Sequence, residues 1–135
     1  MAVFAATDFN ITIGGADFSG SLAAVTLDIS REQLETTAFG DAARTYIAGL
    51  QDATLTLSFH QDFAASAVDS TLHSALGSEV AVVIKPTSAA VGATNPTYSF
   101  NALVTQIQPF ASNVGDLATQ DVTFPVSGAI TRATS

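Results

Sequence analysis

The sequence ATLTLSF at residues 53–59 decides the fold class. Ala53, Leu55, Leu57 and Phe59 fall on one side of an extended chain, and the intervening hydroxyl residues fall on the other. This alternation predicts a strand with one buried and one solvated face, which is typical of antiparallel sheets. The stretch VTLDIS at residues 25–30 alternates in the same way and predicts a second strand of this kind.

A polar, threonine-rich segment, residues 31–46, connects these two expected strands. A connection of this length is uncommon inside a compact domain and is usually functional or disordered. It carries no catalytic constellation, but Leu34, Phe39, Tyr46 and Ile47 are spaced among its charges. We therefore expect an arm, at about residues 31–46, that contacts something outside its own domain.

Other strands are expected over residues 10–13, 80–84, 98–107 and 122–126. The first ends at Gly14-Gly15, a pair that tolerates the positive φ of a hairpin turn. Residues 80–84 are apolar on both faces, as in a strand covered on two sides or covered on one side by a partner subunit. The switch of apolar face within residues 98–107 indicates a bulge or a strand buried on both sides.

Two further local signals complete the predicted fold. Pro125 places the last strand at an edge or a bulge, because proline has no N–H for a ladder. Residues 67–76 have helical spacing, with a capping box at Ser66 and Asp69 and a terminating Gly77. The prediction is a mainly β single domain over residues 1–135. It is an antiparallel β-sandwich or barrel with one short α-helix (about 67–76) and a long arm between early strands.

Charge is sparse and acidic. The chain has 12 acidic and 4 basic residues, a net charge of −8, and 12% charged residues, about half of the usual share. So few charges suit a surface rich in Thr, Ser and Ala, or one covered by neighbours, which makes an assembly the first hypothesis. One lysine and three distant arginines argue against binding to nucleic-acid phosphates or to an anionic membrane. No cysteine, signal peptide or membrane-inserting run is recognised, so we expect use without secretion.

The titratable residues suggest no chemistry. The two histidines, His60 and His73, with Asp62 and Asp69 do not have the spacing of a four-ligand metal site. Asp69 and His73 are four residues apart and predict a surface pair on the helix. No serine lies in a nucleophile elbow. We predict no enzymatic activity, no metal and no cofactor.

Four phenylalanines lie outside the expected core positions. Phe4, Phe39, Phe63 and Phe110 fall in expected loops or at a terminus. Exposed aromatic residues in a chain of low charge are candidates for an interface. The alternative, that each folds back onto its own domain, stays equally open.

Several phrases resemble a known family: ETTAFG at 35–40, RTYIAGL at 44–50, NPTY at 95–98 and VTFPVSG at 122–128. In order and layout, residues 10–130 resemble the tail tube (major tail) proteins of long-tailed bacteriophages. The resemblance implies a virion protein that is made in the host bacterial cytoplasm. It also implies six-copy rings, with sheets joined edge to edge around a channel, that stack into a tube through which DNA passes unbound. The implied partners are other copies and the tail-end, tape-measure and baseplate proteins.

The resemblance also implies roles for individual residues. The arm would contact the neighbouring ring, and its expected contact residues are Leu34, Thr37, Phe39, Asp41, Arg44 and Tyr46. A channel that passes DNA without holding it needs like charge. We therefore predict that several of five acids face the lumen: Asp8, Asp17, Asp28, Asp52 and Asp62.

Two other function classes stay open. A phage decoration or baseplate protein, or a sugar-binding β-sandwich, fits the same fold prediction. The absence of Trp and the presence of only two Tyr argue mildly against sugar binding, which uses exposed aromatic platforms. A small hydrolase has the least support.

Overall fold

The computed structural model describes residues 8–63 and 68–134, and its strands form one antiparallel sheet in the order β2-β1-β5-β6-β7-β4-β3. The elements are β1 (Asn10–Ile13), β2 (Ala16–Asp17), a 3₁₀ turn (Ser19–Ser21), β3 (Leu22–Glu35), β4 (Tyr46–His60), α1 (Val68–Ala75), β5 (Glu79–Lys85), β6 (Thr97–Leu103) and β7 (Thr119–Ala133). The prediction of a mainly β fold with one short helix is confirmed for the described residues.

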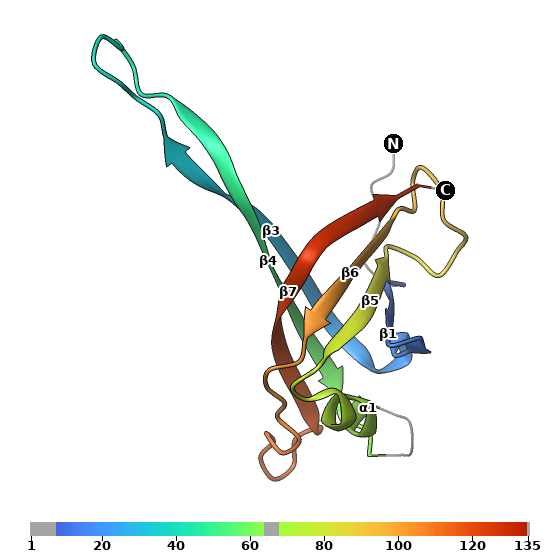
Figure 1. Cartoon of the computed structure of the whole chain (residues 1–135). Helices are drawn as coiled ribbons and strands as arrows, with labels where there is room; N and C mark the ends of the chain where they lie inside the picture. Colours follow the sequence, from blue (N-terminus) through green and yellow to red (C-terminus); the bar gives the residue numbers. More distant parts are fainter. Residues whose placement is uncertain (1–7, 64–67, 135) are drawn as a thin grey trace.

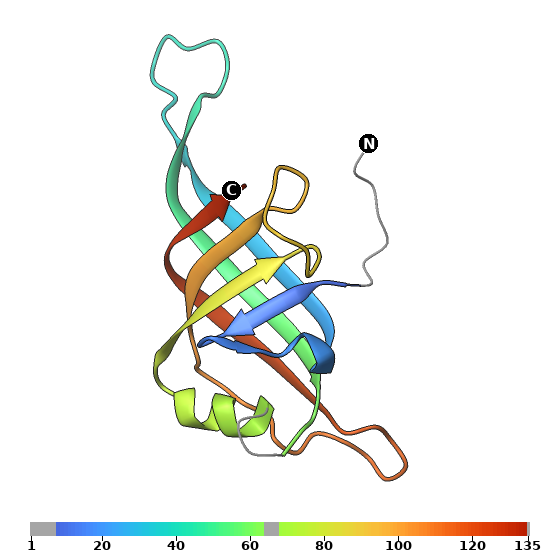
Figure 2. The same ribbon diagram turned by 90° about the vertical axis from the view of Figure 1, so that its right-hand side faces the viewer.

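The sheet bends into two layers at β7. The first half of β7 pairs with β4, from Thr119 to Pro125, and the second half pairs with β6, from Val126 to Ala133. One strand thus belongs to both layers, and Figure 2 shows β3 and β4 crossing behind β1, β5 and β6. The fold is a sandwich whose layers are joined through β7.

Pro125 does not lie in an edge strand, so that part of the prediction is wrong. β7 is an interior strand, but Pro125 makes its last pair with β4, opposite Thr54. The register with β6 shifts between Ser99 and Asn101, next to Gly128 with a φ of 85°. Proline is therefore tolerated where β7 changes partners, and the expected bulge lies shortly beyond it.

The core lies between the layers. The four residues expected to face inward in β4 are all buried, at 0% exposure for Leu55 and Leu57. Leu55, Leu57 and Phe59 pack with Ile11, Val82 and Phe124 in one cluster. In β5 the face opposite the core is partly open within this chain, because Ala81 is exposed and Val83 is half-buried, whereas Val82 on the inner face is buried.

The helix closes the end of the sandwich away from the arm (Figure 1). It buries Val68 and Leu72. Gly77 ends this segment with a φ of 86°, and its N–H donates to Val104 O at 2.7 Å. Ser66, the expected first half of the capping box, lies outside the described residues.

Candidate assembly surfaces

The arm is a β-ribbon at its base: of residues 31–46, which were expected as a connection between strands, residues 31–35 and Tyr46 lie in β3 and β4. β3 and β4 stay paired beyond the body as far as Glu35 and Tyr46, so only residues 36–45 form the turn. Figure 1 shows this ribbon projecting away from the sandwich. It was missed because neither face of the ribbon covers a core, so its sequence does not alternate, whereas backbone pairing needs no such pattern.

Hydrogen bonds within the ribbon hold its tip. Thr36 N–H donates to Thr45 O at 2.8 Å, and Thr45 N–H donates to Thr37 Oγ1 at 2.9 Å. Ala38 N–H donates to Asp41 Oδ2 at 2.7 Å, and Asp41 N–H returns to Ala38 O at 3.1 Å. These bonds close a tight turn.

The turn displays Phe39. Gly40, the residue after it, has the positive φ, 98°, that a tight turn of this kind requires. Phe39 stands fully exposed at the apex. The tip therefore presents an aromatic ring on a closed turn.

The six residues predicted as arm contacts divide into two kinds. Thr37 and Asp41 are used inside the tip, as described above. Leu34 and Tyr46 lie exposed on the ribbon, and Arg44 Nη1 lies 3.3 Å from Glu35 Oε1 in an exposed ion pair. Phe39 completes the exposed group. Their contact with another ring stays a prediction.

An irregularity at the base of the arm requires glycine. The β3–β4 register shifts between Arg31 and Gln33, and Arg31 Nη1 donates to Gly49 O at 3.2 Å. A Cβ built on Gly49 would lie 2.8 Å from Glu32 Oε2 and 2.9 Å from Glu32 Cβ. A side chain at position 49 would therefore crowd Glu32 at this bulge.

The outer face of the β3–β4–β7 layer is acidic. Asp28 lies opposite Thr54, and Asp52 lies opposite Ser30. Asp121 joins them from β7, where its Oδ1 accepts a 2.6 Å bond from the Ser58 hydroxyl. The other described residues of this face in the body include no lysine or arginine: Ala24, Thr26, Ser30, Thr54, Thr56, Ser58, His60, Thr119, Thr123 and Pro125. Asp121 was not among the acids predicted from the sequence, although the alternation of DVTF at 121–124 predicts that its side chain points outward.

The other three predicted lumen acids lie elsewhere. Asp8 precedes β1, Asp17 belongs to the edge strand β2, and Asp62 follows β4. Hydrogen bonds from the Ser88 N–H and hydroxyl lower the pKa of Asp8 below its usual value. The five acids therefore do not share one face, and which of them face a lumen stays a prediction.

Hydrogen bonds also lower the pKa of Asp17. The Ser19 hydroxyl is the larger cause, and the Ser19 N–H, at 2.9 Å, is the second. The same hydroxyl oxygen accepts the Ile11 N–H at 3.0 Å. Asp17 thus helps to fix the turn that leads from β2 to β3.

β3 offers a long free edge. It ends the sheet order and pairs only with β4 among the described residues, over Leu22–Glu35, whereas the opposite edge strand β2 has two residues. A long unpaired edge is a ready template for a strand of another chain.

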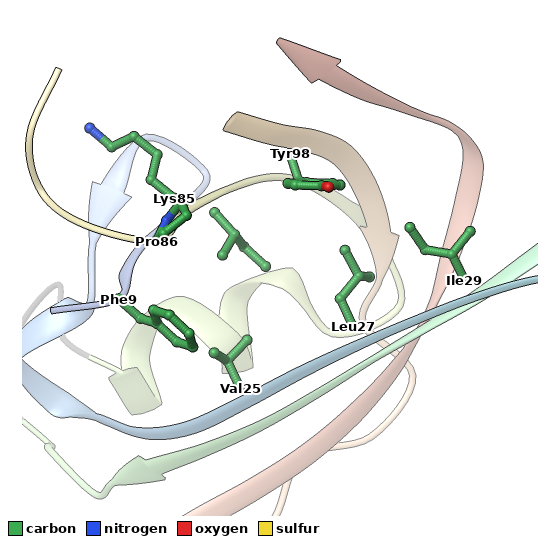
Figure 3. Close-up of a pocket in the computed structure, with 8 residues that line it drawn as sticks. Phe9, Val25, Leu27, Ile29, Lys85, Pro86 and Tyr98 are labelled. Carbon is green, nitrogen blue, oxygen red and sulfur yellow. The ribbon is translucent and has the colours of Figure 1, made fainter. Parts of the chain in front are cut away.

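A groove lies beside that edge, where the two layers separate (Figure 3). Val25, Leu27 and Ile29 of β3 face Tyr98 and Pro86 across about 320 Å³. Ile29, an inward residue by its alternation, is 46% exposed here. The lining is largely apolar and offers no set of catalytic groups.

No metal-type cluster occurs among residues 8–63 and 68–134. Asp69 and His73 lie in the first and last turns of α1, and His60 ends β4 exposed. None of the helices in those residues is long and apolar enough to cross a membrane.

Comparison with solved structures finds this fold in chains of gene transfer agent particles and of a contractile injection system. The chain is similar to one in the virion of a native gene transfer agent particle, with a TM-score of 0.78, 13% identity, and coverage of 97% of this chain and 99% of the other. It is similar to one in the sheath/tube terminator of an extracellular contractile injection system, with a TM-score of 0.73, 18% identity and 96% coverage of each chain. A third is the C6-symmetric tail of an empty gene transfer agent particle, with a TM-score of 0.65, 14% identity, and coverage of 96% and 98%. No protein-family model matches the sequence, and the comparison with curated proteins gives no match.

These similarities establish the fold of the chain. They agree with the resemblance to phage tail proteins noted from the sequence at the level of a phage-tail-type fold.

Proposed function

We propose that this protein is a structural tail subunit that assembles into hexameric rings stacked as a tube, a channel for DNA passage. The observation that carries this is the projecting β3–β4 ribbon, whose Phe39 is fully exposed and is not covered by any other described residue. A free monomer gains nothing from such a ribbon, whereas an assembly buries it.

Two other features support ring formation. The free edge of β3 is long enough to pair with a neighbouring copy and continue the sheet around a ring. The acidic face with Asp28, Asp52 and Asp121 turns away from the core and suits the wall of a channel that repels phosphates. A map of the assembled tube with these three acids on its outer wall would remove this part of the proposal.

The test is assembly of the purified full chain, followed by negative-stain microscopy and sedimentation. Tubes or rings are expected from the wild type. Deletion of Thr36 to Ala43 should leave a folded domain that no longer forms tubes, because the turn and Phe39 are removed while the body ladder is retained. Normal tubes from the deletion variant contradict the role of the arm, and a wild type that stays monomeric at high concentration contradicts the assembly.

A tail-end or baseplate role is the second candidate. It is favoured by the similarity to a sheath/tube terminator at a TM-score of 0.73. A terminator closes a tube rather than extending it, so the same micrographs separate the two. Single rings without stacking favour the terminator, and long tubes favour the tube subunit. The groove at Tyr98 gives no support to sugar binding, because its walls are largely apolar.

A further inference from the structure

A second exposed apolar surface lies at the end of the molecule opposite the arm. This loop patch consists of Phe63, Phe110, Val114 and Leu117, with exposed fractions of 56% for Phe63 and 86% for Phe110. Both views place the loop between β6 and β7 at the far end from the ribbon (Figures 1 and 2). The Phe63 and Phe110 rings are stacked, with centroids 5.6 Å apart and an interplanar angle of 26°. The pair contributes little to the core of its own domain, which leaves it available to another molecule.

A buried glutamine fixes the base of this patch. Gln120 occupies an inward position of β7 and is 0% exposed. Gln108 N–H donates to Gln120 Oε1 at 3.1 Å, and Gln120 Nε2 donates to Gln61 Oε1 at 3.3 Å. Gln61 Nε2 in turn donates to Pro109 O at 2.9 Å, next to Phe110.

This network holds the patch at the expense of an apolar core position. A buried amide is tolerated only when its hydrogen bonds are made. A leucine at position 120 would fill the same space in the core and would need no hydrogen-bond partner. The glutamines therefore position the chain immediately before Phe110, at Gln108 and Pro109. Such preorganisation lowers the entropy that is lost when a surface binds a partner.

We propose that the loop patch is the docking surface for the arm tip of a second copy of this chain. The inference rests on the proposed function and names the surface that the arm contacts. Phe39 of one copy packs against the stacked Phe63 and Phe110 of the next. The two surfaces lie at opposite ends of the molecule, so the contact is heterologous and repeats along one direction.

Charge favours this pairing over contact between two loop patches. The charged residues within the patch segment are Asp62 and Asp116, and residues 46–84 and 86–131 contain no lysine or arginine. Two patches in contact would bring these acids together. The arm has three acids, Glu32, Glu35 and Asp41, but also two arginines, Arg31 and the exposed Arg44, which is paired with Glu35. It can therefore bring cations to the acidic rim, which a second patch cannot.

Disulfide trapping tests the contact directly, because the chain has no cysteine of its own. Full-length Phe39→Cys and Phe110→Cys proteins are mixed, assembled and mildly oxidised. A crosslinked dimer on a non-reducing gel is expected, which requires both proteins and disappears with reductant. Two control pairings use the same Phe39→Cys protein. One pairs it with Val91→Cys, which lies on a loop outside both surfaces, and the other pairs it with Ile29→Cys, which lies in the groove. Crosslinking through Ile29→Cys in place of Phe110→Cys assigns the arm to the groove and overturns the proposal.

A second variant separates this inference from the proposed function. Phe110→Ser should keep the thermal midpoint of the wild type, because the ring is exposed, and should lose stacked tubes while rings persist. Val91→Ser is the control and should stack normally. Wild-type tubes together with normal tubes from Phe110→Ser overturn only the docking surface. Absence of any wild-type assembly overturns the proposed function itself.

Discussion

The body half and the arm half of the β3–β4 ribbon are built from the same two strands and stabilised differently. In the body half, β4 also pairs with β7, and Leu55 and Leu57 are fully buried. In the arm half, no third strand joins among the described residues, and Ile47 and Leu50 are 57% and 78% exposed. An isolated two-stranded hairpin is marginally stable in water. The arm thus depends on the body for its position and gains further cover only from a partner.

The largest expected effect comes from one substitution made in each half of β4. Leu57→Ala should lower the free energy of unfolding by about 2–5 kcal/mol, because it removes buried methyl groups and leaves a cavity. Leu50→Ala should change it by less than about 0.5 kcal/mol, because the side chain is already in water. Urea unfolding of both variants measures the difference. Equal losses would mean that the arm half has a core of its own.

The same contrast explains how much of the fold was predictable from sequence. Alternation in residues 53–59 predicted the buried face of β4 correctly, since one face of that strand meets a core. In β3 it predicted the face of Val25, Leu27 and Ile29 but not their partial exposure. Those residues face the open groove at the sheet edge. Alternation predicts the face to which a side chain points, but it does not predict whether other residues bury that side chain.

The assembly surfaces were less predictable because their signals are not periodic. Phe39, Phe63 and Phe110 were recognised as aromatics outside the core pattern, and all three are exposed. Phe4 lies outside the described residues. Gln120 was not recognised, because a polar residue at an inward position is indistinguishable in sequence from a break in the strand. Its function depends on Gln61 and Gln108, contacts that only the folded chain brings together.

A smaller effect is expected where the two halves meet, at Gly49. Gly49→Ala places a methyl group against Glu32 Cβ, so the ribbon must shift at its bulge. Overpacking costs about 1–3 kcal/mol in a rigid core, but the exposed ribbon relaxes, so the body should lose less than about 1 kcal/mol. The change should instead redirect the arm and reduce tube formation, which sedimentation measures.

Gly20→Ala, where an added Cβ meets nothing within 4 Å, is the control and should assemble normally. Full assembly of Gly49→Ala would show that the direction of the arm does not depend on this glycine.

The smallest expected effect belongs to the body alone and depends on pH. The pKa of Asp17 is lowered in the folded state, chiefly by the Ser19 hydroxyl, so the ionised carboxylate stabilises the fold. This contribution is complete above the unfolded pKa of about 3.9 and is lost as the pH falls through the lower folded value. Asp17→Asn should therefore be slightly less stable than the wild type at neutral pH, and the difference should shrink in acid. The difference is small because water screens the exposed carboxylate. Ser19→Ala should weaken the same pH dependence, since it deletes the main donor and leaves the Ser19 N–H in place. Thermal unfolding from neutral to acidic pH measures both variants, and a gap that widens on acidification would contradict the assignment. The arm half contains neither residue, so tube formation at neutral pH should be the same for both variants as for the wild type.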